Sequence, residues 1–341
     1  MNKPLVSIII VNWNGENVIG ECLSSLFAQN YKNIEVIVVD NNSFDSSKKI
    51  IKKFEKVKFI ENEKNKGFAA GNNIGFKKAS GKYILLLNND TEVSKEFLDP
   101  LVRVLEENEN IVVVQPKILF KKSHFYTDGR INSIGSFFTS SGILYHIGYG
   151  KLDMPVYNKS FKIFTAHGSC MLLRKNHAQK IGLFDPDFFA YFEETDFCLR
   201  VWLSGGEIIY IPDSIVYHKG GVSARKYGNK QVIFHSFKNR ICCYLKNFET
   251  LTLLRILPVQ ILLCEFQAFL YLLFGNINGF FSVQKAFMWN IRNFNDTLNK
   301  RKIVQQTIRK VKDKTFLKEV EKNPRILYYL YFLKGLEYYK D

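Results

Sequence analysis

The sequence predicts an α/β fold, a mostly parallel sheet with helices on both faces, followed by a helical and basic C-terminal region. In the first 120 residues, apolar runs rich in Ile and Val alternate with segments of helical period. Parallel strands need such crossover helices, and their runs are apolar throughout because both faces are buried. From Gln231 onward, Leu- and Phe-rich helical segments alternate with basic patches. We therefore expect two parts, residues 1–225 and 226–341.

The first part begins with five expected strands and four expected helices. The strands are the apolar runs at 6–11, 34–39, 57–60, 84–87 and 111–114. The helices are the periodic segments at 16–28, 43–54, 68–79 and 94–105. Ser43 with Asp45, and Ser94 with Glu96, supply the N-cap and first-turn acid that favour a helix start.

Regular structure is interrupted between residues 119 and 165, which are rich in Gly, Ser and aromatic residues and have no clear period. We interpret this segment as a long excursion that contacts an acceptor. After it, "GSCMLLRK" (168–175) predicts a strand, and "ETDFCLRVWLSGG" (194–206) predicts a helix that ends at a glycine pair. "EIIYIPDSIVYH" (207–218) predicts another strand.

Positive charge is concentrated at the C-terminal end. The formal net charge is +16, of which +13 falls on residues 221–341 and +3 on residues 1–220. Such asymmetry favours a polyanionic partner. The basic residues alternate with apolar runs instead of forming a solvated patch, so an anionic membrane surface is favoured and nucleic acid is not expected.

Residues 251–274 form an apolar stretch long enough to span a bilayer. Arg255, Gln260, Glu265 and Gln267 interrupt it, and Pro258 would kink it. We therefore expect a helix that lies in the interface of an anionic leaflet. A packed helical subdomain and a homodimer interface remain open alternatives.

The cell compartment is expected to be the cytoplasm. Six cysteines (Cys22, Cys170, Cys198, Cys242, Cys243 and Cys264) form no C-x-x-C motif and no paired framework. The apolar run at the start is too short for a signal peptide, and no small-residue cleavage site follows it. With the basic C-terminal region, this predicts a protein held peripherally on the inner face of the cell membrane.

Polar groups are concentrated at the ends of three of the expected strands. The first strand ends at Val11, Asn12 and Trp13, the second at Asp40 and Asn41, and the fourth at Asn88, Asn89 and Asp90. Ligands of parallel α/β sheets bind at this edge. An aromatic ring and a carboxylate suit a nucleobase, and a carboxylate among amides suits Mg²⁺ or Mn²⁺ on a diphosphate. Each residue alone is also an ordinary turn residue.

"NKGFAAGNNIG" places Gly67, Gly71 and Gly75 on one helix face. A small-residue stripe lets a helix pack closely on the sheet, and this is one interpretation. The other is that the polar residues around the helix start, Asn65 and Asn72 among them, face a ligand together with Gly67.

An acidic cluster and a histidine complete the candidate site. Glu193, Glu194 and Asp196 crowd one helix start, where one carboxylate can serve as a general base. Asp196 is four residues from Arg200 and fits a helical ion pair, which leaves Glu194 freer to accept a proton, and Glu193 is expected to face away from Glu194. His218 ends a strand before a Gly pair, a position that suits a metal or phosphate contact as well as a structural role.

Together these pieces resemble the inverting family 2 glycosyltransferases of the GT-A type, which have a Rossmann-like sheet, and especially their rhamnosyltransferase-like members. The resemblance runs from about residue 4 to residue 222 through "VSIIIVNWN", "VIVVDNNSFD", "NKGFAAGNN", "YILLLNNDTEV", "FFAYFEETDFCLR" and "YIPDSIVYHKGG". It implies transfer of a sugar from a nucleoside diphosphate donor, with Mg²⁺ or Mn²⁺ on the diphosphate.

The resemblance also assigns roles. Asp40 and Asn41 match nucleoside-contacting positions, Asp90 the last acid of the metal-binding triplet, and His218 a metal- or diphosphate-contacting histidine. Asn88 replaces the first acid of that triplet. Glu194 stands where the family usually has an Asp as base, so Asp196 remains an alternative base.

The expected function is transfer of a sugar to a hydroxyl of a glycan or polyprenyl-linked glycan in cell-surface polysaccharide synthesis. Deoxythymidine diphosphate rhamnose is the donor we expect, from the resemblance only. A catalytically degenerate, nucleotide-binding, membrane-docked assembly protein is the alternative. A nicotinamide dehydrogenase is disfavoured because "NWNGENVIG" after the first strand lacks G-x-G-x-x-G.

Overall fold

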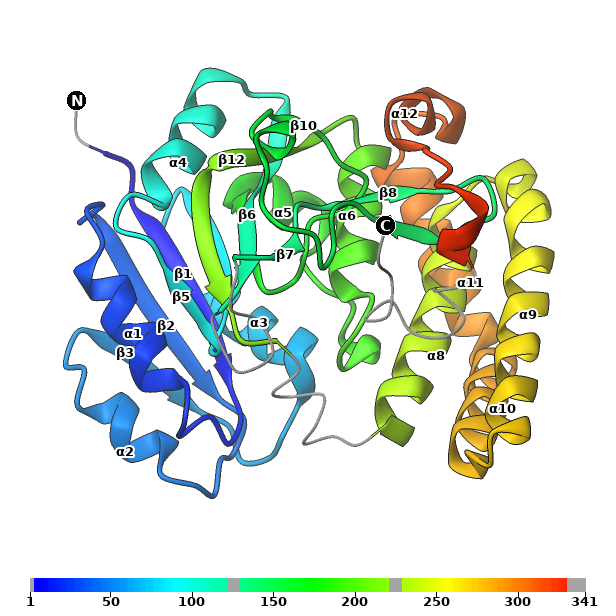
Figure 1. Cartoon of the computed structure of the whole chain (residues 1–341), viewed down its shortest axis with the longest axis horizontal. Coiled ribbons are helices and arrows are strands. Elements are labelled where there is room, and N and C mark those ends of the chain that lie inside the picture. Colours follow the sequence, from blue (N-terminus) through cyan, green and yellow to red (C-terminus); the bar gives the residue numbers. More distant parts are fainter. Residues whose placement is uncertain (1–2, 122–128, 221–228, 330–341) are drawn as a thin grey trace.

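A computed structural model of the chain describes residues 3–121, 129–220 and 229–329. The sheet lies on one side of the molecule, and the C-terminal helices stack on the side away from β1, β2 and β3 (Figure 1). The predicted boundary at 225/226 lies outside the described residues.

The sheet runs in the order β10-β12-β6-β11-β4-β1-β2-β3, with β5 paired to β12 and β7 paired to β6. The strands are β1 (Val6–Asn12), β2 (Ile34–Asp40), β3 (Val57–Glu61), β4 (Tyr83–Asn88), β5 (Thr91–Val93), β6 (Ile111–Phe120), β7 (Ile131–Ser133), β10 (Phe161–Lys162), β11 (Cys170–Arg174) and β12 (Glu207–His218). The predicted α/β architecture is confirmed. β11 pairs antiparallel with both β4 and β6, and so joins two parallel groups, β4-β1-β2-β3 and β6-β12.

Helices cover both faces of the sheet. The helices of this part are α1 (Ile19–Ala28), α2 (Ser47–Lys52), α3 (Gly67–Lys78), α4 (Leu98–Glu107), α5 (Lys175–Ile181) and α6 (Glu193–Leu203). Side chains of β1 alternate between two cores: Ile8 and Ile10 belong to the core that includes α1 and α4, and Ile9 to the core that includes α3 and α6. A strand buried on both faces reads as an unbroken apolar run, which is the pattern seen in the sequence.

Residues 119–165 contain short strands rather than one open loop. Besides β7 and β10, β8 (Ser136–Phe138) pairs with β9 (Leu144–His146), and Pro155–Tyr157 forms a 3₁₀ turn. Three-residue strands are too short to show a period in the sequence, which explains why none was expected there.

The C-terminal helices share the larger core. They are α8 (Asn229–Asn247), α9 (Thr250–Leu273), α10 (Ile277–Arg292), α11 (Phe294–Ile303) and α12 (Asp313–Val320). On α8 and just after it, Tyr244 and Phe248 lie with Phe138 in that core, and the Phe138 and Phe248 ring centroids are 5.2 Å apart. Residues of α8, α9 and α12 therefore extend the hydrophobic core of the sheet, whereas a smaller core between α8, α9 and α10 consists of Phe237, Cys264, Ala268, Val283 and Ala286.

Candidate active site

The strand register brings the predicted site residues together at one edge of the sheet. Asn12 lies beside Asp40 across β1 and β2, and Val11 lies beside Asn88 across β1 and β4. Because these strands are parallel and end at the same level, the loops that follow them converge there.

Asn12 is a central residue that the sequence reasoning left out of the site. Its amide donates to Asp40 Oδ2 (3.3 Å) and Ser43 Oγ (3.2 Å), and its carbonyl oxygen accepts from Asn89 Nδ2 (2.7 Å). The Ser43 N–H donates to Asp40 Oδ1 at 2.8 Å. Asp40 is fully buried, and its carboxylate and the Asn89 amide thus hold the ends of β1, β2 and β4 together. The feature of the sequence that could have identified Asn12 was its position at the end of a strand, next to Trp13.

Asn41 is also used to fix the backbone. Its Nδ2 donates to Gly67 O (3.0 Å), and its Oδ1 accepts from Asn62 Nδ2 (2.9 Å). The Gly67 N–H in turn donates to Asn65 Oδ1 at 2.9 Å. Gly67 has φ +81°, and a Cβ there would lie 2.5 Å from Phe189 O, so both its conformation and its surroundings require glycine.

The rest of the glycine stripe packs helix α3 on the sheet. A Cβ at Gly71 would lie 2.8 Å from Val11 Cγ1, and one at Gly75 would lie 2.5 Å from Ile9 Cγ2. The Asn72 amide donates to Phe68 O within the same helix. The packing interpretation therefore describes Gly71 and Gly75, and Gly67 is also closely packed, against Phe189.

Two aromatic side chains stand in the loops after β1 and β2. Trp13 is partly buried, and Phe44 is 84% exposed. The Phe44 N–H donates to Asn14 Oδ1 at 3.0 Å, which ties the two loops together. Phe44 was missed; its signal was an aromatic residue in a turn otherwise made of small and polar residues.

Asp90 and His218 face each other at 3.2 Å (Oδ1 to Nε2), and both are buried. β5 brings them together, because Thr91 pairs with His218 on β12. The other ring nitrogen, Nδ1, lies 3.1 Å from Asn132 Oδ1. Burial raises the pKa of the Asp90 carboxyl, but the charge and hydrogen bond of His218 outweigh it and lower that pKa below its usual value.

The Asp90–His218 pair fits a divalent cation that is bound together with a nucleotide. Both ring nitrogens of His218 face oxygen acceptors, so the site attracts positive charge. Two neighbouring ligands of an octahedral Mg²⁺ lie about 3 Å apart, since each is about 2.1 Å from the metal. No cluster of three or more His, Cys, Asp or Glu that could hold a metal occurs in the described ranges. Nucleotide-bound Mg²⁺ commonly has only one or two protein ligands, with phosphate and water supplying the rest.

Asp196 is an anchor of helix α6. Its carboxylate is fully buried and accepts from Arg200 Nε (3.1 Å), Lys246 Nζ (2.9 Å) and Asn247 Nδ2 (2.7 Å). The predicted ion pair with Arg200 is present. A carboxylate held by three donors is poorly placed to take a proton from a substrate.

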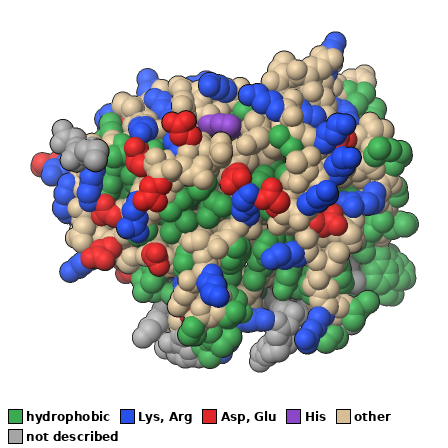
Figure 2. Space-filling view, turned by 90° about the horizontal axis from the view of Figure 1, so that it is seen from above, with side chains coloured by type: hydrophobic (Ala, Val, Ile, Leu, Met, Phe, Trp, Pro, Cys, Tyr) green, Lys and Arg blue, Asp and Glu red, His purple; other side chains and the backbone are tan. Residues whose placement is uncertain are grey.

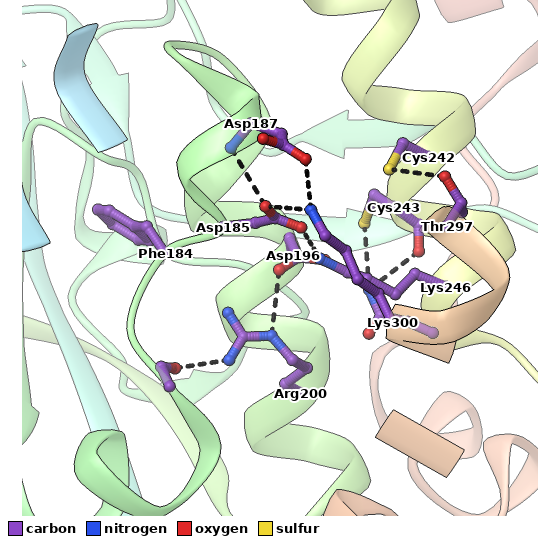
Figure 3. Close-up of polar contacts among 12 residues, drawn as sticks. Phe184, Asp185, Asp187, Asp196, Arg200, Cys242, Cys243, Lys246, Thr297 and Lys300 are labelled. Atoms are coloured by element: carbon purple, nitrogen blue, oxygen red, sulfur yellow. Dashed lines mark hydrogen bonds and ion pairs between the residues drawn. The ribbon is translucent and has the colours of Figure 1, made fainter. Parts of the chain in front are cut away.

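Asp196 belongs to a charged network that joins α6 to the C-terminal helices (Figure 3). Lys246 on α8 also contacts Asp185 at 2.8 Å, and Lys300 on α11 contacts Asp185 and Asp187 at 2.7 and 2.6 Å. Burial disfavours charge on Asp185, but the two lysines outweigh it and lower the pKa of that carboxyl far below its usual value. Neither lysine had a sequence signal, because each meets its partners across at least 50 residues of chain.

Glu194 lies over a glycine of the neighbouring loop. A Cβ at Gly168 would be 3.7 Å from Glu194 Cγ, and the His167 ring next to that glycine lies 5.9 Å from the His218 ring. The acid is thus on the same edge as the Asp90–His218 pair. Burial raises the pKa of Glu194 to about 7.

The expectation that Glu193 turns away from Glu194 is wrong. Glu193 is 4% exposed, and its carboxyl interacts with that of Glu194. Burial, and then the Glu194 charge, raise the pKa of Glu193 well above its usual value. The first turn of α6 lies inside the protein, so it has no solvent-facing side on which to place this residue.

The segment before α6 has an unusual backbone. Phe189, Tyr191 and Phe192 have φ values of 57°, 70° and 67°, a region that bulky side chains rarely adopt. On α8, Asn239 Nδ2 donates to the carbonyls of Phe188, Ala190 and Tyr191 at 2.8, 2.9 and 2.6 Å. One buried amide therefore holds the turn that leads into Glu193 and Glu194.

Residues 7–182 match the family model described as glycosyl transferase family 2. The low-salt glycan biosynthesis hexosyltransferase Agl10 of Haloferax volcanii is 27% identical over 242 residues, which are 69% of this chain and 74% of that protein. An uncharacterized glycosyltransferase of Haemophilus influenzae is 28% identical over 240 residues, 67% of this chain and 70% of that one.

Two solved structures share the fold. The mannosyltransferase PcManGT from Pyrobaculum calidifontis, in complex with GDP-Man and Mn²⁺, has a TM-score of 0.54 at 16% identity and is matched over 86% of this chain and 76% of its own. GalNAc-T7 with UDP, GalNAc and Mn²⁺ has a TM-score of 0.56 at 18% identity. That match covers 72% of this chain and 48% of GalNAc-T7, so this chain spans about half of that protein.

Proposed function

This chain belongs to glycosyl transferase family 2, and we propose that it is an inverting enzyme with a nucleoside diphosphate sugar as donor. The acceptor we propose is a hydroxyl of a glycan or polyprenyl-linked glycan. Our candidate donor is deoxythymidine diphosphate rhamnose. The observation that carries the proposal is the convergence of the Asp90–His218 pair and Glu194 on one edge of the sheet.

Asp90 and His218 are the proposed holders of a divalent cation on the donor diphosphate. Mn²⁺ accompanies the nucleotide or nucleotide sugar in the structures of PcManGT and GalNAc-T7, which supports this choice. When bound, the cation offsets negative charge on the leaving diphosphate. The Asn132 contact fixes the ring so that Nε2 faces Asp90, as second-shell partners of metal ligands do.

The nucleoside part of the donor is proposed to lie over the ends of β1, β2 and β4. Trp13 stacks on the base, and the partly exposed Asn65 and Asn88 offer amide groups to the sugar or diphosphate. The remaining predicted residues are proposed to act mainly by shaping this edge. Some have polar atoms that are hydrogen-bonded within the protein, and others pack closely against their neighbours. These residues are Val11, Asp40, Asn41, Gly67, Asn72 and Asn89.

Glu194 is the proposed general base. With a pKa of about 7, a substantial fraction of its carboxyl groups are ionised at neutral pH and able to take a proton. The acceptor hydroxyl gives its proton to the Glu194 carboxylate while its oxygen bonds to the anomeric carbon. The bond from that carbon to the diphosphate breaks on the opposite face, and the electron pair leaves with the diphosphate. Attack from the opposite face inverts the anomeric configuration.

The proposed location is the inner face of the cell membrane, to which the basic C-terminal region binds. A polyprenyl-linked acceptor would lie at the same membrane, so the proposed location and the proposed acceptor depend on each other. A homodimer through the same region is the competing proposal.

A donor screen tests the proposed function. Nucleoside diphosphate sugars with Mn²⁺ are added to the whole chain, and the melting temperature is recorded. A ligand at about 100 times its Kd stabilises the folded state by about 2.7 kcal/mol, so a true donor stands out. Asp90→Ala should lose this shift, and the control Glu92→Ala, two residues further along on β5, should keep it.

Turnover separates the enzyme from its alternative. The stabilising donor is incubated with glycan acceptors, and the anomeric configuration of the product is read by NMR. Donor stabilisation without transfer or hydrolysis would favour the degenerate assembly protein, and a retained configuration would refute the inverting mechanism.

A further inference from the structure

Helix α9 exposes most of its large apolar side chains, and apart from Ile256 the side chains that it buries are small or polar. Its buried stripe is Ile256, Gln260, Cys264 and Ala268, and Gln260 Nε2 donates to Ser141 O at 2.7 Å. Its exposed apolar residues are Leu251, Leu254, Val259, Ile261, Leu262, Phe266, Phe269, Leu272 and Leu273. A helix on a water-exposed surface shows the reverse arrangement, and small residues at helix contacts are typical of proteins that have lipid as a neighbour.

Helix α10 extends this surface. It packs against α9 after a short turn at Phe274, which is 83% exposed. It adds Ile277, Phe281, Met288 and Ile291, each 46 to 68% exposed. Hydrophobic side chains gather along the right-hand side of the molecule in Figure 2, the side that α9 and α10 occupy in Figure 1. We call these exposed apolar residues of α9, Phe274 and α10 the α9–α10 face.

Charges on and around the α9–α10 face are mainly basic. Glu265 is the one carboxylate in either helix, and it accepts a hydrogen bond from Gln284. Lys285 and Arg292 of α10 are exposed. At the start of α9, a hollow of about 450 Å³ is lined by Leu251, Thr252, Arg255, Lys314, Leu317, Lys318 and Glu321. The two leucines of the hollow thus lie among three cations and one carboxylate. That carboxylate, Glu321, is paired with Arg255.

We propose that the α9–α10 face lies in the interfacial layer of an anionic membrane leaflet. Its apolar side chains enter the acyl region, and Lys285, Arg292 and the cations of the hollow meet lipid phosphates. This proposal deepens the membrane location given above and rests on that part of the proposed function. Sugar transfer plays no part in the argument, so vesicle binding and sugar transfer can fail separately.

The geometry favours this occupant over two others. By length and composition, α9 is the one helix in the described residues that could cross a bilayer. Its buried stripe, however, runs from Ile256 to Ala268 against the protein, which places the helix along the surface. A two-fold dimer would place the α9–α10 face of one copy against the same face of the other. Neither α9 nor α10 has an unengaged carboxylate that could pair with Lys285 and Arg292 of the second copy.

Vesicle flotation of the whole chain tests the proposal. Vesicles of phosphatidylcholine, with and without phosphatidylglycerol, are compared for the parent chain and for a triple variant, Leu254→Gln, Leu262→Gln and Phe269→Gln. These three side chains are 69%, 71% and 50% exposed, so their loss should spare the fold. Burial of each contributes enough that every substitution should weaken partition by about tenfold. Val156→Ser is the control, because Val156 is 67% exposed but lies outside the face.

The expected result is flotation of the parent and of the Val156 control on anionic vesicles, weakened by salt, with little flotation of the triple variant. Lys285→Gln with Arg292→Gln should reduce the preference for phosphatidylglycerol. The proposal is overturned if the triple variant floats as well as the parent, or if the parent floats on no vesicle. A parent that dimerises without binding vesicles would assign the face to a second copy. Resistance to alkaline carbonate would indicate a spanning helix.

Discussion

Substitution of Asn239 by alanine should slow catalysis without weakening donor binding. Its amide is fully buried on α8 and reaches the carbonyls of Phe188, Ala190 and Tyr191. Those carbonyls belong to the turn that leads into helix α6 and the proposed base, Glu194. Without the amide, the turn loses the donors that hold it in its unfavourable conformation.

The magnitude follows from two opposing terms. An NH₂ group has two hydrogens, so two buried hydrogen bonds are lost, at about 1–3 kcal/mol each. The three positive φ values in the turn store strain of about 1–3 kcal/mol each, and part of it is released when the turn relaxes. We therefore expect a modest loss of stability, about 1–3 kcal/mol, together with a displaced turn. A misplacement of about 1 Å at a reacting group costs about 100-fold in rate, so kcat should fall by about that factor.

Asn290 provides a matched control. It is also buried, lies on α10, and donates to two helix carbonyls, those of Lys238 and Ala286, and to none of the turn carbonyls that Asn239 holds. Asn290→Ala should destabilise the protein by a similar amount in urea titrations and leave kcat near the parent value. The assay is steady-state transfer with both substrates varied. Equal loss of kcat in the two variants, or unchanged kcat in a folded Asn239→Ala protein, would refute the positioning role.

Three further outcomes are expected. Glu194→Gln should lower kcat by about 10²- to 10⁴-fold with donor affinity nearly unchanged. Because the base works in its ionised form and burial raises its pKa to about 7, the kcat of the parent should rise as the pH increases through about 7. If Glu194→Gln keeps this rise in its pH profile, the assignment is wrong. Asp90→Ala should abolish Mn²⁺-dependent affinity for nucleoside diphosphate in calorimetry, and unchanged affinity would exclude a metal role. Lys246→Met leaves Asp185 and Asp196 buried with one fewer cation, so denaturant unfolding should show a loss of about 3–5 kcal/mol; a loss below about 1 kcal/mol would show that the network does not hold α6.

The fold and the position of the site could be predicted because both depend on local patterns. Apolar runs reveal strands that are buried on both faces, and polar residues at the ends of such strands gather at one edge. The antiparallel direction of β11 could not be predicted, because an apolar run has the same composition in either direction. The contacts of Asp196 with Lys246 and Asn247, and those of Asn239, join residues more than 45 positions apart in the chain, and no local pattern records such pairings.

The choice between Glu194 and Asp196 shows the same limit. Spacing alone predicted the Arg200 pair, but it gave no sign of Lys246 and Asn247, which occupy the rest of the Asp196 carboxylate. The burial of Glu193 could not be predicted either, because the local sequence does not show that α6 begins inside the protein.

The network in Figure 3 has a consequence for the order in which the protein can mature during synthesis. Asp185 and Asp196 leave the ribosome well before Lys246 and Lys300, their counterions. Until those lysines arrive, Asp185 lacks both of these cations and Asp196 has only Arg200, and burying a carboxylate with too few partners is costly. We therefore expect the helix that carries Glu194 to settle only after most of the chain has been made. A nascent chain can form the strands β1 to β4 early, yet the proposed base is not held in place until the C-terminal helices dock.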